Sequence, residues 1–185
     1  MKLKALLLCL SFLLSSSLFA VQIGKTAPNF TLKNQDGGEF SLETNKGKVW
    51  TVLYFYPKAD TPGCTKQACA FRDAIKVIEK ENTRVYGVST NSVKDLKKFQ
   101  DKYKLKFELL SDEEGKVSKL YDTKIPLLKM SKRHTFILDP QLHVRFIETD
   151  VDPAMDAQVV ANKIIELQKQ DSEKHMNKYE HNRHP

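Results

Sequence analysis

The sequence predicts an α/β fold whose central mixed sheet carries helices on both faces and starts with a hairpin. Three observations predict it. Apolar runs of strand length alternate with segments that place apolar residues at helical spacing, and a hairpin followed by a helix closes the chain. The 185 residues are enough for one domain with a sizeable core, and no repeat or linker interrupts them.

The first half of the chain carries clear element signals. Asn34-Gln35-Asp36-Gly37 is typical of a tight turn and predicts a hairpin between strands at 30–33 and 38–42. The run from Val49 to Tyr56 is almost continuously apolar, which is typical of a central strand covered on both faces. A helix over 62–81 follows, because its apolar residues recur at intervals of three and four.

The second half continues the alternation. Ser92 is typical of a helix cap and predicts a helix over 92–103. The turn Asp139-Pro140-Gln141-Leu142 predicts a second hairpin, and Pro153 opens a final helix that ends near Gln168. The other expected elements are strands at 84–89, 107–110, 134–138 and 144–148 and a short helix at 117–121.

Residues 1–20 differ in composition from the rest of the chain. Two lysines near the start precede an apolar run at 5–14, and a serine-rich segment that ends in Ala20 follows, which is the pattern of an export signal. We expect cleavage after Ala20, with cleavage after Ser17 as an alternative. An uncleaved membrane anchor is a second alternative, although the apolar run is short for a span. The mature protein is then expected in the periplasm or outside the cell, without stable insertion in a membrane.

The charge of the mature chain is modest and scattered. The full sequence has a formal net charge of +7, and removal of Lys2 and Lys4 leaves 28 basic against 23 acidic residues, a net charge of +5. Basic and acidic residues are interspersed, which is typical of a solvated surface; a nucleic-acid partner is an alternative that we do not favour. Loss of the signal also removes Cys9, so Cys64 and Cys69 remain.

Residues 169–185 form a polar tail after the expected domain at 21–168. They carry no apolar periodicity and end in a proline, so we expect them to be disordered. His175, His181 and His184 are an alternative as a loose metal site, but their spacing is not that of a fixed site. We expect no metal and no cofactor in the protein.

The segment from residue 57 to residue 69 carries the most specific chemistry. Pro57 cannot donate to a sheet ladder and ends the central strand, and Thr61 and Pro62 are typical of a helix cap and first helical residue. Cys64 then falls in the first turn of the helix. Free backbone N–H groups and the helix dipole stabilise an anion at that position, which favours the reactive thiolate. The sequence therefore predicts that Cys64 is a nucleophile.

This segment resembles the active-site loop of peroxiredoxins. Pro57, Thr61 and Cys64 match the family pattern Pro-x-x-x-Thr-x-x-Cys, and Cys69 is similar to the resolving cysteine of the bacterioferritin comigratory protein (PrxQ) branch. The resemblance covers most of the mature chain. It continues at Ala27-Pro28-Asn29-Phe30, Phe71-Arg72-Asp73, Leu110-Ser111-Asp112 and Arg133-His134-Thr135-Phe136-Ile137-Leu138-Asp139.

The resemblance implies a fold, a reaction and a set of roles. The fold is the thioredoxin fold of the peroxiredoxin type. Cys64 attacks a hydroperoxide, Thr61 hydrogen-bonds the thiolate and the peroxide, Arg133 stabilises both, and Pro57 shapes and shields the loop. Cys69 then forms a disulfide with Cys64, which a thioredoxin-like dithiol protein reduces. For the assembly we expect a monomer rather than a dimer.

Purely structural interpretations of these residues are alternatives. Thr61 alone reads as a helix cap and Arg133 as a surface arginine, while Arg72 stays unassigned and His134 is expected to be a half-buried strand residue. A structural disulfide is disfavoured, because Cα atoms five residues apart on a helix lie about 8–9 Å apart, beyond the reach of about 7 Å.

Two other function classes remain as alternatives. A thioredoxin-like disulfide carrier would show Cys-x-x-Cys, whereas four residues separate the two cysteines of this chain. A binding protein without enzymatic activity is the other alternative, and it predicts an unreactive Cys64.

Overall fold

The computed structural model describes residues 21–181. Its elements follow the predicted order closely, with one added 3₁₀ turn (η1). They are β1 (Thr31–Asn34), β2 (Glu39–Ser41), η1 (Leu42–Asn45), β3 (Trp50–Phe55), α1 (Pro62–Lys80), β4 (Thr83–Ser89), α2 (Val93–Tyr103), β5 (Glu108–Ser111), α3 (Lys116–Leu120), β6 (His134–Leu138), β7 (Val144–Glu148) and α4 (Asp156–His181).

The strands form one seven-stranded mixed sheet in the order β2-β1-β5-β4-β3-β6-β7. β3 is parallel to β4 and β4 is parallel to β5, whereas β6 pairs antiparallel with β3. Every residue of β3 is buried, as the apolar run predicts for a central strand. β3 therefore delivers the segment that follows it from the middle of the sheet.

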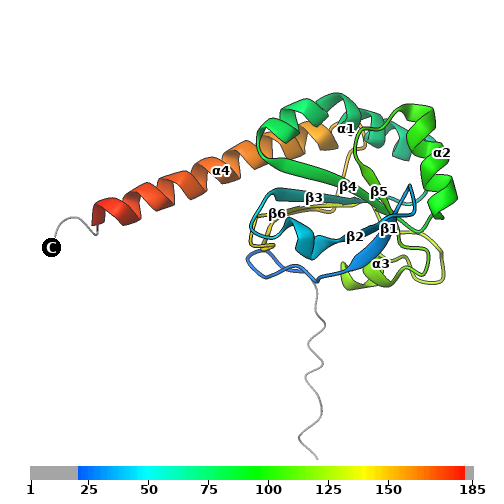
Figure 1. The fold of residues 1–185 in the computed structure, drawn as a ribbon, viewed down its shortest axis with the longest axis horizontal. Helices are drawn as coiled ribbons and strands as arrows, with labels where there is room; N and C mark the ends of the chain where they lie inside the picture. Colours follow the sequence, from blue (N-terminus) through cyan, green and yellow to red (C-terminus); the bar gives the residue numbers. More distant parts are fainter. Residues whose placement is uncertain (1–20, 182–185) are drawn as a thin grey trace, which may run out of the picture.

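Helices cover both faces of the sheet, which confirms the predicted architecture (Figure 1). α1, α2 and α4 share one hydrophobic core with Val52 and Tyr54 of β3. Leu53 and Phe55 point to the opposite face, where they join a second core that includes residues of η1 and α3. This alternation follows from the two-residue period of a strand, and it divides the interior into two layers.

α1 packs lengthwise against α4 on one face of the sheet (Figure 1). Phe71, Ile75 and Ile78 of α1 are almost fully buried at intervals of four and three residues. Each such side chain contributes roughly 1.5–3 kcal/mol through burial. The middle and end of α1 are therefore firmly anchored to the core.

α4 extends beyond its expected end, so the prediction of disorder from residue 169 is wrong up to His181. Residues 169–181 are mostly polar but include neither Gly nor Pro, and they are compatible with a solvated helix. A bidentate pair anchors this part, because both Arg145 Nη atoms lie 2.7 Å from the Asp171 carboxylate. Apolar periodicity, on which the predicted end of the helix rests, carries no signal for this polar contact.

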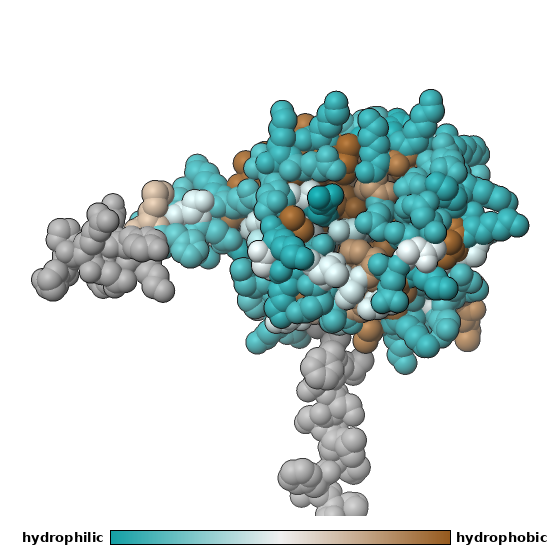
Figure 2. All heavy atoms as spheres, in the orientation of Figure 1, coloured by the Kyte–Doolittle hydropathy of each residue, from teal (hydrophilic) through white to brown (hydrophobic). Residues whose placement is uncertain are grey.

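The two ends of the chain lie outside the described residues. The expected export signal at 1–20 and the residues from 182 onward are among them. Between residues 21 and 181, no helix has both the length and the apolar character needed to cross a membrane. The face seen in Figure 2 is mainly hydrophilic, with hydrophobic residues scattered among hydrophilic ones.

Candidate active site

The loop after β3 and the start of α1 have the predicted geometry. Thr61 is the N-cap residue in extended conformation, and Pro62 is the first helical residue. The Thr61 hydroxyl does not cap the helix within the described chain; it donates to the carbonyl of Lys58 at 2.9 Å. Thr61 therefore tightens the loop that begins at the half-buried Pro57.

Cys64 lies in the first turn of α1, where the backbone N–H groups have no acceptor within the helix. The residue is only 2% exposed. Its Sγ accepts a hydrogen bond from Arg133 Nη2 at 3.5 Å. A buried sulfur thus faces both the positive end of a helix and a permanent cation.

Sheet pairing explains how Arg133 reaches a cysteine 69 positions away. β6 runs antiparallel to β3 and pairs His134 with Phe55, so Arg133 lies at the edge of the sheet where β3 ends. The chain leaves β3 at this same edge to form the cysteine loop. The side chains of Cys64 and Arg133 therefore converge because β3 ends and β6 begins there.

Gly63 provides the space for this contact. A methyl group at Gly63 would lie 3.3 Å from Arg133 Nη2. That distance is shorter than ordinary van der Waals contact between carbon and nitrogen, so a larger residue would push the guanidinium away. The small residue next to Cys64 is thus part of the site geometry.

A buried chain of hydrogen-bonded polar side chains continues behind Arg133, and no local sequence motif predicts it. Arg133 Nη1 donates to Gln67 Oε1, and Gln67 Nε2 donates to Asp156 Oδ2 at 2.6 Å. Thr135 Oγ1 donates to the same carboxylate oxygen at 2.8 Å. Burial raises the pKa of Asp156, while the hydrogen bonds from Gln67 and Thr135 act in the opposite direction.

Cys69 lies on the same unbroken helix as Cys64 and is half-buried. Both are free thiols within the described residues. This arrangement agrees with the predicted geometry, in which a regular helix keeps two cysteines five residues apart from bonding.

Residues of α2 hold the region around both cysteines. Asp60, in the loop before α1, accepts from Lys102 Nζ at 2.8 Å and from the Tyr103 hydroxyl at 2.7 Å. Arg72, beyond Cys69, donates to the Tyr103 carbonyl at 3.0 Å and also pairs with its neighbour Asp73. The end of α2 therefore contacts both flanks of the cysteine segment.

The sequence of this fold matches one known protein family over most of its length. Residues 23–147 match the AhpC/TSA family. The chain belongs to the AhpC/TSA family.

Relatives with known sequences place the chain near the Q-type members of the AhpC/TSA family. It is 46% identical over 128 residues to peroxiredoxin Q, chloroplastic, of Oryza sativa subsp. japonica, covering 69% of this chain and 58% of that relative. It is 41% identical over 128 residues to the putative peroxiredoxin bcp of Coxiella burnetii, covering 66% and 84%. The chain thus spans less than two thirds of the length of the rice relative.

A solved structure supports the same grouping within the AhpC/TSA family. Peroxidoxin BcpB from Mycobacterium tuberculosis superposes with a TM-score of 0.74 at 32% identity, covering 78% of this chain and 96% of that chain. The resemblance to peroxiredoxins of the PrxQ branch and the thioredoxin fold of the peroxiredoxin type are therefore confirmed.

His134 next to Arg133 has the environment that the sequence predicts. It is the first residue of β6 and is half-buried. Burial lowers the pKa of its imidazole, and the charge of Lys132 lowers it further. The lowered pKa favours the neutral form of His134, and its half-buried place on β6 fits a structural residue of the strand.

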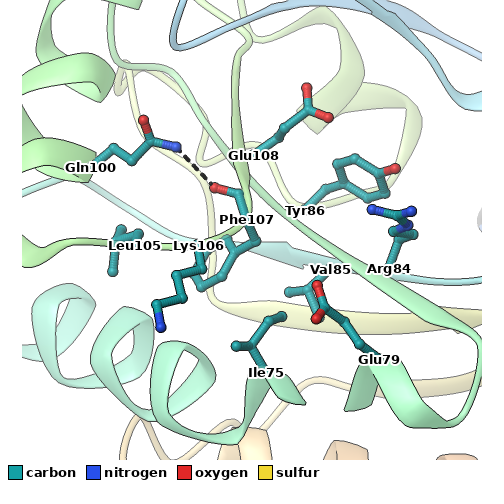
Figure 3. Close-up of a pocket in the computed structure, with 10 residues that line it drawn as sticks. All are labelled: Ile75, Glu79, Arg84, Val85, Tyr86, Gln100, Leu105, Lys106, Phe107 and Glu108. Atoms are coloured by element: carbon teal, nitrogen blue, oxygen red, sulfur yellow. Dashed lines mark hydrogen bonds between the residues drawn. The ribbon is translucent and has the colours of Figure 1, made fainter. Parts of the chain in front are cut away.

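Two surface depressions differ in whether the cysteine loop lines them. One, of about 320 Å³, includes Pro57 and Lys58 of the cysteine loop in its wall. The other, of about 390 Å³, lies between α1, α2 and the edges of β4 and β5 (Figure 3). Charges of both signs line the second depression, and it contains none of the residues of the thiol site. Its charged residues are Glu79, Arg84, Lys106 and Glu108.

Possible metal ligands lie elsewhere in the chain. Among the described residues, no group of three or more His, Cys, Asp or Glu side chains is arranged to hold a metal ion. Of the three tail histidines considered as a loose metal site, His181 and His184 lie where side chains are not described.

Proposed function

We propose that the protein is a thiol peroxidase that reduces hydrogen peroxide and organic hydroperoxides. The contact between Arg133 Nη2 and the buried Cys64 Sγ at 3.5 Å carries this proposal. A cation and a helix N-terminus beside one sulfur favour a thiolate and also stabilise charge on an oxygen bound next to it. Membership of the AhpC/TSA family and similarity to peroxiredoxins Q support the same reaction.

In the first step the Cys64 thiolate attacks the terminal oxygen of the hydroperoxide. A sulfur–oxygen bond forms, the oxygen–oxygen bond breaks, and the leaving alkoxide or hydroxide takes up a proton as alcohol or water. Cys64 is oxidised to sulfenic acid as the peroxide is reduced by two electrons. Arg133 stabilises the charge that moves from sulfur to the leaving oxygen. The Thr61 hydroxyl, whose hydrogen goes to the Lys58 carbonyl, orients the peroxide by accepting a hydrogen bond from it.

In the second step Cys69 resolves the sulfenic acid. Its thiolate attacks the Cys64 sulfur, the sulfur–sulfur bond forms as the sulfur–oxygen bond breaks, and the departing hydroxide takes up a proton to become water. The helix between the two residues unwinds locally to allow the bond. A thioredoxin-like dithiol protein then reduces the disulfide and restores both thiols.

The setting of the reaction is also part of the proposal. We infer export from the signal pattern at residues 1–20, so the enzyme acts in the periplasm or outside the cell. We propose that the enzyme acts there as a monomer, with a small peroxide as substrate and a dithiol protein as reductant. Nucleic acid is not among its proposed partners. The interspersed charges of the chain support the last point.

Peroxide consumption by the purified mature protein tests the function. With a thioredoxin-like reductant present, wild type consumes peroxide, and Cys64→Ser abolishes turnover because its hydroxyl does not ionise near neutral pH. Circular dichroism checks that the variant keeps its fold. Turnover of Cys64→Ser near the wild-type rate would remove Cys64 from the mechanism.

A further inference from the structure

Asp156, the first residue of α4, is connected to the reactive thiol through a buried chain of hydrogen bonds. The chain runs from Asp156 to Gln67, from Gln67 to Arg133 and from Arg133 to Cys64. We propose that Asp156 is a positioning residue that holds Arg133 against Cys64 by fixing the orientation of the Gln67 amide. This inference rests on the proposed peroxidase function and assigns a role within it.

The direction of the hydrogen bonds requires an acceptor at position 156. A guanidinium has only donors, so Gln67 must turn its carbonyl oxygen toward Arg133. Its NH₂ group then points away and needs an acceptor, which Asp156 Oδ2 provides at 2.6 Å. Gln67 is fully buried, so water has no access to replace the carboxylate.

The fold holds each member of this chain in place. Gln67 lies three residues after Cys64, so both side chains occupy one face of α1 and contact the same guanidinium. Thr135 of β6 donates to Asp156 Oδ2 at 2.8 Å and fixes the carboxylate from the sheet side. Packing of α4 against α1 keeps Asp156 beside Gln67.

The acceptor role requires an oxygen but not a negative charge. Both donors, Gln67 and Thr135, bind Oδ2, whereas Oδ1 has no hydrogen-bond partner among the described residues. An asparagine can present its side-chain oxygen to both donors and place its amide where Oδ1 lies. Asp156→Asn should therefore preserve the position of Arg133, whereas Asp156→Ala should release the Gln67 amide and with it the guanidinium.

The test compares Asp156→Ala and Asp156→Asn by two measurements on the reduced protein. One is the second-order rate constant for hydrogen peroxide, and the other is the pH midpoint of Cys64 alkylation in a Cys69→Ser background. We expect Asp156→Ala to react about ten- to a hundredfold more slowly, because a displaced catalytic group loses its alignment. Its alkylation midpoint should move to higher pH, while Asp156→Asn should stay close to wild type in both measurements.

Asp112 offers a matched control for loss of a buried carboxylate. It is 2% exposed, like Asp156, and accepts hydrogen bonds from Val117 and Ser118 at the start of α3, near the opposite face of the sheet. Asp112→Ala should lower the melting temperature without moving the alkylation midpoint. If it slows the peroxide reaction as much as Asp156→Ala does, general destabilisation explains the result and the inference is overturned.

Other outcomes separate the remaining explanations. A wild-type rate for Asp156→Ala would overturn the inference, and so would an Asp156→Asn variant as slow as Asp156→Ala, because the charge would then matter rather than the acceptor. If Asp156→Ala does not fold, Gln67→Leu breaks the same chain and must show the same two effects. If wild type is inert toward peroxide but the alkylation midpoints differ as expected, the proposed function fails and the positioning role stands.

Discussion

The side chain of Cys64 combines near-complete burial with contact to a permanent cation. Burial disfavours a charged sulfur, since removal of water raises the free energy of an ion. The guanidinium of Arg133 and the backbone N–H groups in the first turn of α1 act in the opposite direction, because both stabilise negative charge on the sulfur. The sulfur is therefore shielded from water and still lies beside two groups that stabilise negative charge.

At the residue scale, Arg133→Ala should alter both ionisation and reaction at Cys64. The alkylation midpoint should move to higher pH, and peroxide attack should slow by about a hundredfold even where the thiol is fully ionised, because an electrostatic donor to the transition state is lost. Stopped-flow measurement of the second-order rate against pH checks both effects.

Arg133→Lys is the matched control, because it keeps the charge but not the planar fork that contacts Cys64 and Gln67 together. We expect the pH midpoint of Cys64 alkylation in Arg133→Lys to lie close to the wild-type value. The rate of peroxide attack at fully ionised thiol should stay further below that of wild type. If Arg133→Ala and wild type react with peroxide equally fast at the pH where the thiol is fully ionised, Arg133 acts only on the ionisation of the thiol.

Single residues of the site differ in how readily a sequence reveals them. Cys64 and its helix N-terminus follow from local signals alone, and family resemblance adds Arg133. Gln67 and Asp156 are 89 positions apart, and each reads as an ordinary polar residue on a helix. Only the packing of α4 against α1 brings them together, so no local pattern predicts their bond. The one available signal was that Gln67 lies one turn after Cys64 on the same helix face.

At the element scale, α1 is unevenly anchored along its length. Its later turns bury Phe71, Ile75 and Ile78, whereas the segment between the cysteines buries the polar Gln67 and the small Ala68. Apolar burial therefore opposes unwinding much less around Cys64 and Cys69 than beyond residue 71. We therefore expect a local opening at the start of α1 to disturb the core less than an opening beyond residue 71, although Cys64 and Ala68 belong to the core.

Formation of the Cys64–Cys69 disulfide should melt this segment selectively. Amide hydrogen exchange at residues 65–72 should be much faster in the oxidised protein than in the reduced protein, because a regular helix cannot hold the bond. Amides beyond residue 72 in α1 serve as the internal control and should remain protected. Equal exchange at 65–72 in both redox states would contradict this view of the disulfide.

Cys69→Ser tests the resolving role separately. The variant should consume one equivalent of peroxide, stop at sulfenic acid and become prone to irreversible oxidation, since residues 21–181 then hold no second thiol to condense with it. Mass spectrometry distinguishes sulfenic, sulfinic and sulfonic acid. Normal turnover of Cys69→Ser with the dithiol reductant would instead indicate a single-cysteine cycle.

Most elements could be predicted from the sequence because their signals are local and mutually consistent. Alternating apolar runs predicted the strands, and the N-cap positions Thr61 and Ser92 predicted two helix starts, although only the Ser92 side chain caps its helix. The end of α4 could not be placed in this way. Its last turns are stabilised by backbone hydrogen bonds and by the contact between Asp171 and Arg145 of β7, neither of which produces an apolar period.

At the scale of the whole molecule, the export proposal predicts where the mature chain begins. N-terminal sequencing of the protein isolated from its own cells should start at Val21, because the small residue Ala20 ends the expected cleavage site. Cleavage at the alternative site, after Ser17, would instead give Leu18 as the first residue. An N-terminus that retains residue 1 or 2 would contradict cleavage.

The length of α4 affects how the protein moves through solution. Its 26 residues span about 39 Å, more than the diameter of about 30 Å that is typical of a small domain. Figure 1 shows the C-terminal part of the helix extending away from the sheet and its covering helices. Such a shape increases friction relative to a sphere of equal mass. A monomer will therefore leave a gel-filtration column early and resemble a larger species, whereas sedimentation equilibrium will report its mass without regard to shape.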